Sequence, residues 1–573
     1  MAVTPGPLRR AVGRIRNVIR PNVTITTPPD GVLVEYDVPV AVRDGTVLRV
    51  NVYRPEGGGT YPVMMSAHPY GKDYRPKPTR NGYRPFPNLR ILPQSQPFSF
   101  SAWTGWEAPD PAYWVPRGYV VVNADLRGWG TSEGIGTLLG AGEGEDYHDL
   151  IEWAAAQPWS TGRVGLNGVS YLALSQWAAA ATRPPHLAAI CPWEGFTDFY
   201  RDVARPGGVR ENGMMIVWTK GTARTRPDSA VDLRQQQLAR PLYDEWWAER
   251  DREIEKIDVP ALVCGSFSDH NLHTRGSFEG FRRIASRQKW LYTHRGPKWS
   301  VFYSGDALAE QARFFDHFLK GEDNGQDALP PVRLEVREDA VTVTSVRREQ
   351  QWPPAGTAWQ RWHLGRDGSF SDQPASSPAT SSFHTRRGNL VYRRRFRTDT
   401  EIVGPMRLQL AVEVQGGGDV NVFAAVRKVR RGRLVAFEAA YGFRGPLVTN
   451  GMRKVSHHIL DADDRPRDDV AEPLRPGQIV QLEIELLPSA TLFRAGEDLE
   501  LVIQGQWFHA RNPFTGQFPS YYEKSPRGVC TVHFGAGHDT YLDVPVQTGA
   551  AAWPPVGPTS TGSREPTPSP TES

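Results

Sequence analysis

Short apolar segments alternate with longer helix-period segments through the first half of the chain. The apolar runs include PVMMSAH (62–68), YVVVNAD (119–125), VGLNGVS (164–170), LAAICPW (187–193), ALVCGS (261–266) and KWLYTH (289–294). Between them lie EDYHDLIEWAAA (145–156) and LALSQWAAAA (172–181), whose composition and period predict helices. Strand and helix in alternation at this spacing predict a parallel sheet flanked by helices.

Three other regions depart from this pattern. Residues 32–55 form two strand-like segments around Asp44-Gly45, which predicts a β-hairpin. Residues 195–258 are irregular and rich in Arg, Trp and Met, which indicates an inserted cap. After residue 332 the chain reads as alternating strands punctuated by Gly and Pro, which predicts an antiparallel β-sandwich.

The domain organisation predicted from these shifts has five parts. They are a basic N-terminal arm (1–29), an α/β domain in two pieces (30–194 and 259–331), a helical cap (195–258), a β-sandwich (332–546) and a disordered tail (547–573) rich in Pro, Ser and Thr.

The N-terminal arm carries five arginines and no acid in its first twenty residues. Leu8, Val12, Ile15 and Ile19 recur at helical spacing on one face. Such a segment suits a basic amphipathic helix on a membrane surface. An arm packed on the protein's own body, or left free of it, is the simpler interpretation, and we therefore expect no membrane contact.

Composition excludes several classes of protein. The 67 basic and 63 acidic residues nearly balance, so no nucleic-acid partner is expected. Three cysteines far apart in sequence, Cys191, Cys264 and Cys530, provide neither a disulfide framework nor a CxxC metal site, and a reducing cytoplasm fits them best. No apolar run approaches the ~20 residues of a membrane span.

The strongest chemical signal is Gly165-Leu166-Asn167-Gly168-Val169-Ser170-Tyr171, between a predicted strand and a predicted helix. A sharp turn there would expose Ser170 as a nucleophile above the sheet edge. The usual G-x-S-x-G pattern is incomplete, because Leu172 stands where its last glycine would be. A serine that merely caps a helix is the alternative interpretation.

A serine nucleophile needs an orienting acid and a base, which in this fold follow it in the order Ser, Asp, His. Asp269 comes just after the strand ALVCGS, and His294 ends the strand KWLYTH. Both are therefore predicted at the carboxyl ends of sheet strands, and His294 is predicted as the base. Three other histidines compete with it, namely His270 and His273, which lie very close to Asp269 in sequence, and His317 on a later helix.

The oxyanion of an acyl-transfer reaction needs two hydrogen-bond donors. We expect one to be the backbone N–H of Tyr171 and the other to be the phenol of Tyr70 in the loop His68-Pro69-Tyr70. Aromatic residues beside these motifs, of which Trp193, Phe196 and Trp218 are the predicted substrate-binding residues, suit an apolar acyl pocket. No metal and no organic cofactor is expected.

In combination, the motifs HPYGKD, NADLRGWGTSEG, NGVSYLALSQW and FFDHFLKG resemble the family of cocaine esterase and X-prolyl dipeptidyl aminopeptidase. The resemblance implies an α/β-hydrolase domain with an inserted helical cap, followed by a C-terminal jelly-roll-like β-sandwich. It also implies a Ser170, Asp269 and His294 triad with Tyr70 and the Tyr171 amide as oxyanion donors. The family's Gly-Pro-Trp-x-His loop appears here as Thr293-His294-Arg295-Gly296-Pro297-Lys298-Trp299.

The expected activity is hydrolysis of small-molecule acyl esters or amides through an acyl-enzyme. An X-Pro dipeptidyl-peptidase or α-amino-acid ester hydrolase is the alternative, and it would need a carboxylate for the substrate ammonium, with Glu194, Asp198 and Glu211 as candidates. A non-catalytic protein that binds through its sandwich is a second alternative. A homodimer through strand edges stays open.

Overall fold

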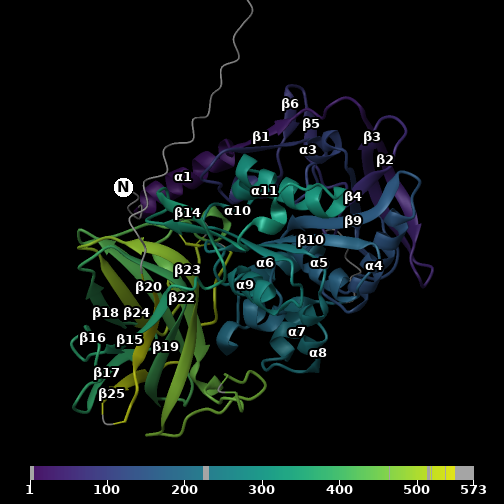
Figure 1. Ribbon diagram of the computed structural model, residues 1–573. Coiled ribbons are helices and arrows are strands. Elements are labelled where there is room, and N and C mark those ends of the chain that lie inside the picture. Colours follow the sequence, from purple (N-terminus) through teal and green to yellow (C-terminus); the bar gives the residue numbers. More distant parts are fainter. Residues whose placement is uncertain are drawn as a thin grey trace, which may run out of the picture.

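The structure is a computed structural model that describes residues 6–223, 231–463, 465–512, 516–517, 519–535 and 537–548. An α/β domain and a β-sandwich lie side by side (Figure 1). Most of the predicted disordered tail, from residue 549 onward, lies outside the described residues.

One mixed sheet forms the centre of the α/β domain. Its strands run in the order β2 (Val32–Ala41), β3 (Val47–Pro55), β8 (Val120–Asp125), β4 (Tyr61–His68), β9 (Ser160–Val169), β10 (Leu187–Trp193), β11 (Ala261–Ser266), β12 (Lys289–His294) and β13 (Val332–Arg337). The first two form the expected hairpin, and the strands from β8 to β13 are parallel. All their carboxyl ends therefore meet along one sheet edge, where ligand sites are built in such folds.

Helices cover both faces of this sheet. Figure 1 shows α11 (Gly305–Phe315) on one side and α4 (Gly142–Ala155), α5 (Tyr171–Ala181) and α9 (Thr274–Arg283) on the other. On β9, Gly165 leaves room for the ring of Phe315, since an added Cβ would lie 2.8 Å from it. Ser175 of α5 donates to the carbonyl of Ala67 in β4 at 2.9 Å. The first approach seats α11 on the sheet, and the second holds α5, and hence its first residue, at the sheet edge.

The segment between β10 and β11 is largely helical, as predicted for the cap. It holds α6 (Met214–Ala223), α7 (Leu233–Ala239) and α8 (Glu245–Ala248). Asp232 and Asp244 cap the last two helices by accepting from the backbone N–H groups of Gln235 and Trp247. A tilted contact between Trp218 of α6 and Tyr171 of α5, with ring centroids 6.0 Å apart, joins this insertion to the domain beneath it.

The C-terminal half is a sandwich of two antiparallel sheets. One contains β15 (Thr357–Leu364), β26 (Tyr541–Gln547), β19 (Thr400–Gln415), β23 (Ile479–Phe493), β25 (Val529–Phe534) and β17 (Ala379–His384), and the other contains β18 (Asn389–Arg395), β24 (Asp498–Gln504), β20 (Asn421–Arg430) and β22 (Leu447–Lys454). Every second residue faces the core, as in Leu408, Leu410 and Val412 of β19. This alternation is what the sequence pattern predicts.

The α/β domain and the sandwich are joined by a strand pairing and by core residues. Arg337 at the end of β13 pairs with Thr491 of β23, so the central sheet continues into the sandwich. Tyr441 and Phe443 from a sandwich loop belong to the core of the α/β domain. The sandwich therefore forms part of the wall around the sheet edge. Among the residues that the structure describes, no helix combines the length and apolar character needed to cross a bilayer.

Candidate active site

Ser170 stands at a strained turn between β9 and α5. Its φ of 61° and ψ of −117° fall in a region that residues with a side chain rarely adopt. Gly168 permits the turn, because a Cβ there would lie 2.5 Å from the Cβ of Leu172. The first glycine of the motif thus makes room for the leucine that replaces the second. The turn leaves Ser170 partly exposed at the sheet edge.

His273 is the imidazole that reaches this serine. Its Nε2 lies 3.3 Å from Ser170 Oγ, and its Nδ1 is hydrogen-bonded to Asp269 Oδ2. Both the imidazole and the carboxylate are buried. With the hydrogen on Nδ1 donated to Asp269, Nε2 is left to accept the serine proton, which is the arrangement of a Ser-His-Asp triad.

His273 takes the place predicted for His294, whose ring nitrogens are hydrogen-bonded to other residues, and the geometry corrects that expectation. Its Nε2 lies 3.0 Å from Glu194 Oε1, and its Nδ1 accepts the N–H of Gly296 at 3.1 Å. The side chain is buried and stacks on Trp193. Both ring nitrogens are therefore engaged in contacts that hold the end of β12.

The reason for the difference is the shape of the loop after β11. His273 lies only four residues beyond Asp269, but it needs no separate strand to face that carboxylate. The loop turns at His270, whose φ is 46°, and α9 begins at Thr274. The four-residue spacing spans about one helical turn and brings the side chains of positions 269 and 273 together. Acid and base thus come from one loop.

Lys298 was not singled out from the sequence, yet it touches both members of this pair. Its Nζ lies 2.7 Å from Asp269 Oδ2 and 2.9 Å from His273 Nδ1, and it is buried. Burial and the ammonium of Lys298 lower the pKa of His273, against the opposing effect of Asp269. Burial raises the pKa of Asp269, but Lys298 and His273 outweigh it, so the carboxyl stays ionised.

Two further carboxyl groups lie close to this centre. Glu107 accepts from the indole N–H of Trp299 at 3.0 Å, and burial raises its pKa to about 8 despite the nearby Lys298. Glu194 Oε2 lies 3.8 Å from Lys298 Nζ. Glu194, Asp269 and His273 come near enough to one another to coordinate a cation. The ammonium of Lys298 already compensates their charge at short range.

Tyr70 and the Tyr171 backbone lie beside the nucleophile. The backbone N–H of Tyr70 donates to His68 Nδ1 at 3.2 Å, while His68 Nε2 bonds Asn123 Oδ1 at 2.9 Å. Burial and Glu107 raise the pKa of Tyr70 well above its usual value, and contact with Ser170 opposes this shift. The phenol therefore remains a donor. Tyr171 follows Ser170 as the first residue of α5, where its N–H has no partner within the helix.

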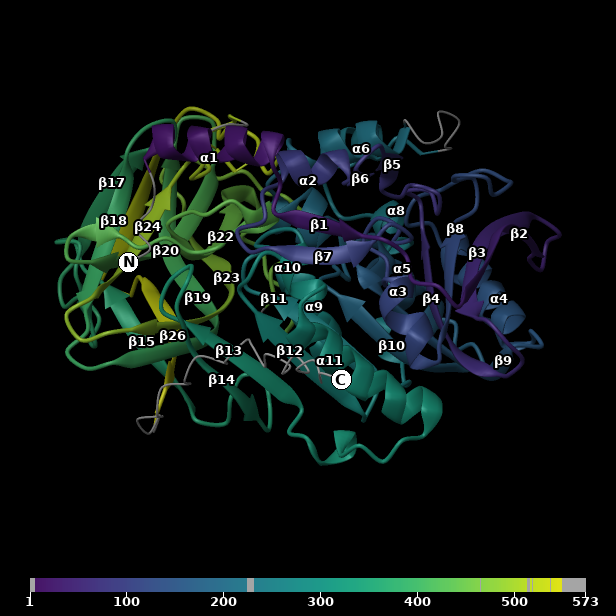
Figure 2. The same cartoon turned by 90° about the horizontal axis from the view of Figure 1, so that it is seen from above.

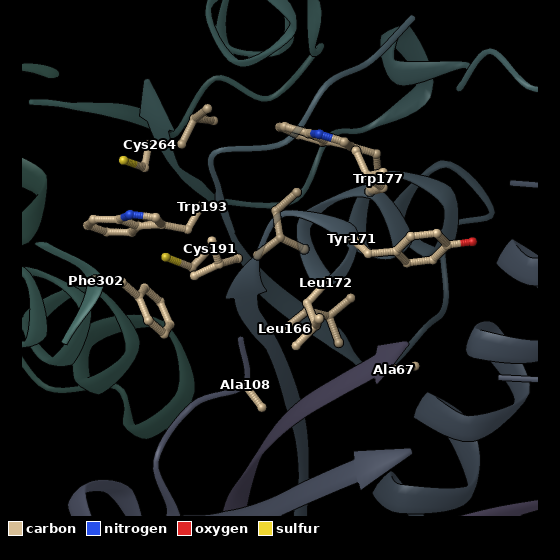
Figure 3. Close-up of a cluster of buried hydrophobic side chains, with 14 of the residues drawn as sticks. Ala67, Ala108, Leu166, Tyr171, Leu172, Trp177, Cys191, Trp193, Cys264 and Phe302 are labelled. Atoms are coloured by element: carbon tan, nitrogen blue, oxygen red, sulfur yellow. The ribbon is translucent and has the colours of Figure 1, made fainter. Parts of the chain in front are cut away.

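Of the three aromatic residues predicted to line the pocket, two lie at the site and one lies in the core. Phe196 stacks on His273, with centroids 6.0 Å apart and planes 9° from parallel, and Trp218 lies against Tyr171. Trp193 is instead fully buried among Tyr292 and Phe302, and Figure 3 shows it beside Cys191 and Cys264. Trp193 thus belongs to the core beneath the site, contrary to the prediction.

The sandwich adds Tyr441 to the site. Its ring centroid is 5.8 Å from Lys298 Nζ, and its hydroxyl lies 3.1 Å from the sulfur of Met214 in the cap. Tyr441 has a φ of 60°, and the next residue, Gly442, has a φ of 78°. Sequence alone offered only the weak signal of Tyr-Gly in a loop. Three regions of the chain therefore meet around Ser170.

A partly exposed serine in contact with a buried histidine and aspartate, at the carboxyl edge of a mostly parallel sheet, defines an α/β-hydrolase. Residues 44–297 match the family model of X-Pro dipeptidyl-peptidase (S15 family), and residues 324–543 match that of the X-Pro dipeptidyl-peptidase C-terminal non-catalytic domain. A solved CocE/NonD family hydrolase from Staphylococcus aureus is 36% identical, with a TM-score of 0.85, and the match covers 90% of this chain and 94% of that one. The chain belongs to the CocE/NonD family of hydrolases.

More distant relatives differ in the activities that their names give. Cocaine esterase of Rhodococcus sp. is 25% identical over 402 residues, covering 60% of this chain and 65% of the relative. The Xaa-Pro dipeptidyl-peptidase of Lacticaseibacillus casei is 26% identical over 315 residues, covering 48% of this chain and 39% of the relative. The chain thus spans less than two thirds of either. The family prediction is confirmed, and the choice between ester and peptide must be argued from the site.

Proposed function

We propose that this protein is a serine esterase in which Ser170 is the nucleophile, His273 the base and Asp269 the orienting acid. The observation that carries the proposal is the continuous contact from Ser170 Oγ through the imidazole of His273 to Asp269 at a strained strand-to-helix turn. A serine that only capped a helix would need neither the strain nor the imidazole.

The reaction follows from these positions. His273 Nε2 takes the proton of Ser170 as Oγ attacks the ester carbonyl carbon, and the phenol of Tyr70 and the N–H of Tyr171 donate to the oxyanion. When the tetrahedral intermediate collapses, the imidazolium returns the proton to the leaving alcohol. Water then attacks the acyl-enzyme by the same route and releases the acid. Asp269 stays ionised beside the imidazolium throughout.

Ester substrates are favoured because the candidate carboxylates for a substrate ammonium are already engaged. Glu194 bonds His294 through Oε1 and lies 3.8 Å from the ammonium of Lys298 through Oε2, and Asp198 pairs with Arg201 at 2.6 Å. Glu211 accepts the backbone N–H groups of residues 213–215 at the start of α6. Binding a substrate ammonium would cost these contacts, whereas a neutral acyl ester asks only for apolar walls such as Phe196 and Trp218.

Two finer inferences accompany this function. We infer a reducing, cytoplasmic location, supported by Cys191, Cys264 and Cys530, which are all buried free thiols. A small-molecule ester or amide is the inferred substrate, with no nucleic acid as partner. Sedimentation velocity tests the homodimer that strand edges would permit.

Labelling with a fluorophosphonate tests the nucleophile directly. We expect one adduct, mapped by mass spectrometry to Ser170, that aryl esters block and Xaa-Pro amides do not. Ser170→Ala should remove the adduct and lower kcat by roughly 10⁴-fold or more, with unchanged circular dichroism. Ser376→Ala, at an exposed serine of the sandwich, is the matched control and should label normally. Blocking by free-amine substrates alone would shift the assignment to the peptidase alternative, and no adduct at all would leave a binding protein.

A further inference from the structure

Helix α1 (Pro7–Ile19) lies on the body of the protein by its polar face. Arg14 donates to the carbonyl of Gly516, and its guanidinium lies 4.1 Å from the centre of the Phe443 ring. Asn17 donates to the carbonyls of residues 89 and 90, at 2.9 and 2.8 Å. Arg14 and Asn17 are buried, so these contacts fix how the helix is rotated about its axis. The simpler interpretation of the arm, packing on the body, is thus correct only for this face.

The apolar face of α1 points to solvent. Leu8, Val12, Ile15 and Ile19 are 78%, 58%, 52% and 73% exposed. A surface helix of a globular protein ordinarily buries its apolar stripe and exposes its charges. The reverse arrangement leaves a contiguous apolar strip on a helix whose rotation is fixed, and such strips mark binding surfaces.

Arginines border this strip along one edge. Arg9 and Arg16 are seven residues, or about two turns, apart and lie roughly a quarter turn from the apolar stripe. Arg20 continues the row just past the helix, and all three are exposed. A helix that lies in a membrane interface has this arrangement, with apolar residues toward the acyl chains and cations at the level of the headgroups.

The surroundings extend the positive charge. Residues 1–29 and 74–106 hold ten of the 67 basic residues of the chain and none of its 63 acidic residues. The hairpin of β5 (Lys77–Thr79) and β6 (Gly82–Arg84) exposes Lys77, Arg80 and Arg84. Figure 2 shows α1, α2 (Pro87–Ile91), α6 and this hairpin along one edge of the molecule. Ile91 and Val217, on α2 and α6, add exposed apolar side chains there.

A groove beneath α1 could receive an anionic headgroup. Its volume is about 390 Å³, and it lies between the helix and residues 93–95 and 442–444. The cationic residues that line it are Arg9, Arg10, Arg14, Arg16, Arg20 and Arg444. Guanidinium groups suit phosphate oxygens, since they donate in a planar fork.

We propose that α1 docks the protein on an anionic phospholipid membrane, with Leu8, Val12, Ile15 and Ile19 entering the interface and the arginines contacting lipid phosphates. A second copy of the chain is a poorer occupant of this face. An isologous contact would bring two basic surfaces together, and the segments that form them contain no acid to pair with. The proposal is independent of the chemistry at Ser170.

Vesicle flotation with the full chain tests the proposal. We expect binding to phosphatidylcholine vesicles that contain about 30 mol % phosphatidylglycerol, little binding to pure phosphatidylcholine, and release by salt. The triple variant Val12→Gln, Ile15→Gln, Ile19→Gln should weaken binding at least tenfold, to judge from the apolar area lost. The variant Arg9→Gln, Arg16→Gln, Arg20→Gln should weaken it roughly a hundredfold.

Matched controls change exposed residues on the sandwich. Val341→Gln with Trp359→Gln, and Arg431→Gln with Arg433→Gln, should bind as the parent does. All substituted side chains are exposed, so thermal midpoints by circular dichroism should stay unchanged. Failure to float with anionic vesicles, or equal binding by all variants, would overturn the proposal. So would a dimer in sedimentation velocity that the apolar variant dissociates without any vesicle binding by the parent.

Discussion

Two histidines at the same sheet edge invite comparison. His273 follows β11 and His294 ends β12, the neighbouring strand. Each is buried, and each contacts a buried carboxylate, Asp269 in one case and Glu194 in the other. By burial and pairing alone they look equivalent. Only one of them approaches Ser170.

The difference lies in the nitrogen that the carboxylate leaves available. Asp269 takes the Nδ1 side of His273, and Nε2 points to the serine. Glu194 takes the Nε2 side of His294, and the N–H of Gly296 occupies Nδ1. A base in acyl transfer needs one unoccupied acceptor nitrogen in reach of the nucleophile. The order of the strands predicts at which sheet edge the base lies. The hydrogen bonds of each imidazole determine which of the two can accept the serine proton.

Replacing each histidine in turn tests directly which of the two is the base. His273→Asn should lower kcat for an aryl ester by roughly 10⁴- to 10⁶-fold, because it removes the imidazole nitrogen that lies 3.3 Å from Ser170 Oγ. His294→Asn should keep kcat within about tenfold, since that ring lies outside the proton path. Stopped-assay kinetics on both variants, with fluorophosphonate labelling, measures the two effects.

The thermal stabilities of the same two variants provide the control. Loss of His294 leaves Glu194 without its buried donor and should destabilise the fold by about 1–3 kcal/mol, visible in thermal unfolding. A fully active His273→Asn enzyme, or a His294→Asn enzyme that is folded but inactive, would reverse the assignment of the base.

The next largest effect should come from Tyr70, the proposed oxyanion donor. Tyr70→Phe should lower kcat by about 10²- to 10³-fold with little change in KM, because the phenol donates mainly to the charge that develops in the transition state. Tyr74→Phe, in the same loop, is the matched control and should be nearly silent. Equal activity of the two variants would remove Tyr70 from the oxyanion hole.

Most of the fold follows from the sequence because its signals are local or periodic. The apolar runs that end at His68, Asp125 and Trp193 are strands of the central sheet, and Asp44-Gly45 lies at the predicted hairpin turn. The two-residue alternation after residue 332 likewise appears in β19 and β23. Each of these patterns reports which face of an element is buried.

The details of the site depended on loop geometry that no pattern encodes. A left-handed residue at His270 lets Asp269 and His273 share one turn, and nothing in the sequence forces that conformation on a histidine. Lys298, the first residue of a short helix (Lys298–Phe302), contacts Asp269 and His273, and Tyr441 contacts Lys298 in turn, although the two lie 29 and 172 residues beyond Asp269 in the chain. Such contacts are tertiary, so sequence spacing could place Ser170 and Asp269 but not the charge beside them.

Lys298 should set the pH range over which His273 stays neutral. Burial and Lys298 lower the pKa of His273, so the acidic limb of kcat/KM should lie below the ordinary histidine value of about 6.5. Lys298→Met removes the neighbouring positive charge and should raise that pKa, so activity is lost at a higher pH than in the parent. Lys256→Met, an exposed lysine, is the control. An acidic limb that does not move would show that the ammonium does not act on the base.

Glu194→Gln should shift the same limb in the opposite direction, by less. Glu194 is a minor influence that raises the pKa of His273, so its neutralisation should lower that pKa and extend activity slightly toward acid. Glutamine keeps an oxygen that accepts from His294 Nε2, so the contact that holds β12 survives and stability should change little. Exposed Glu249→Gln should leave the pH profile unchanged. Opposite shifts of the acidic limb in the Lys298→Met and Glu194→Gln variants would show that both residues act electrostatically on His273. A structural effect would instead lower activity at every pH without moving the limb.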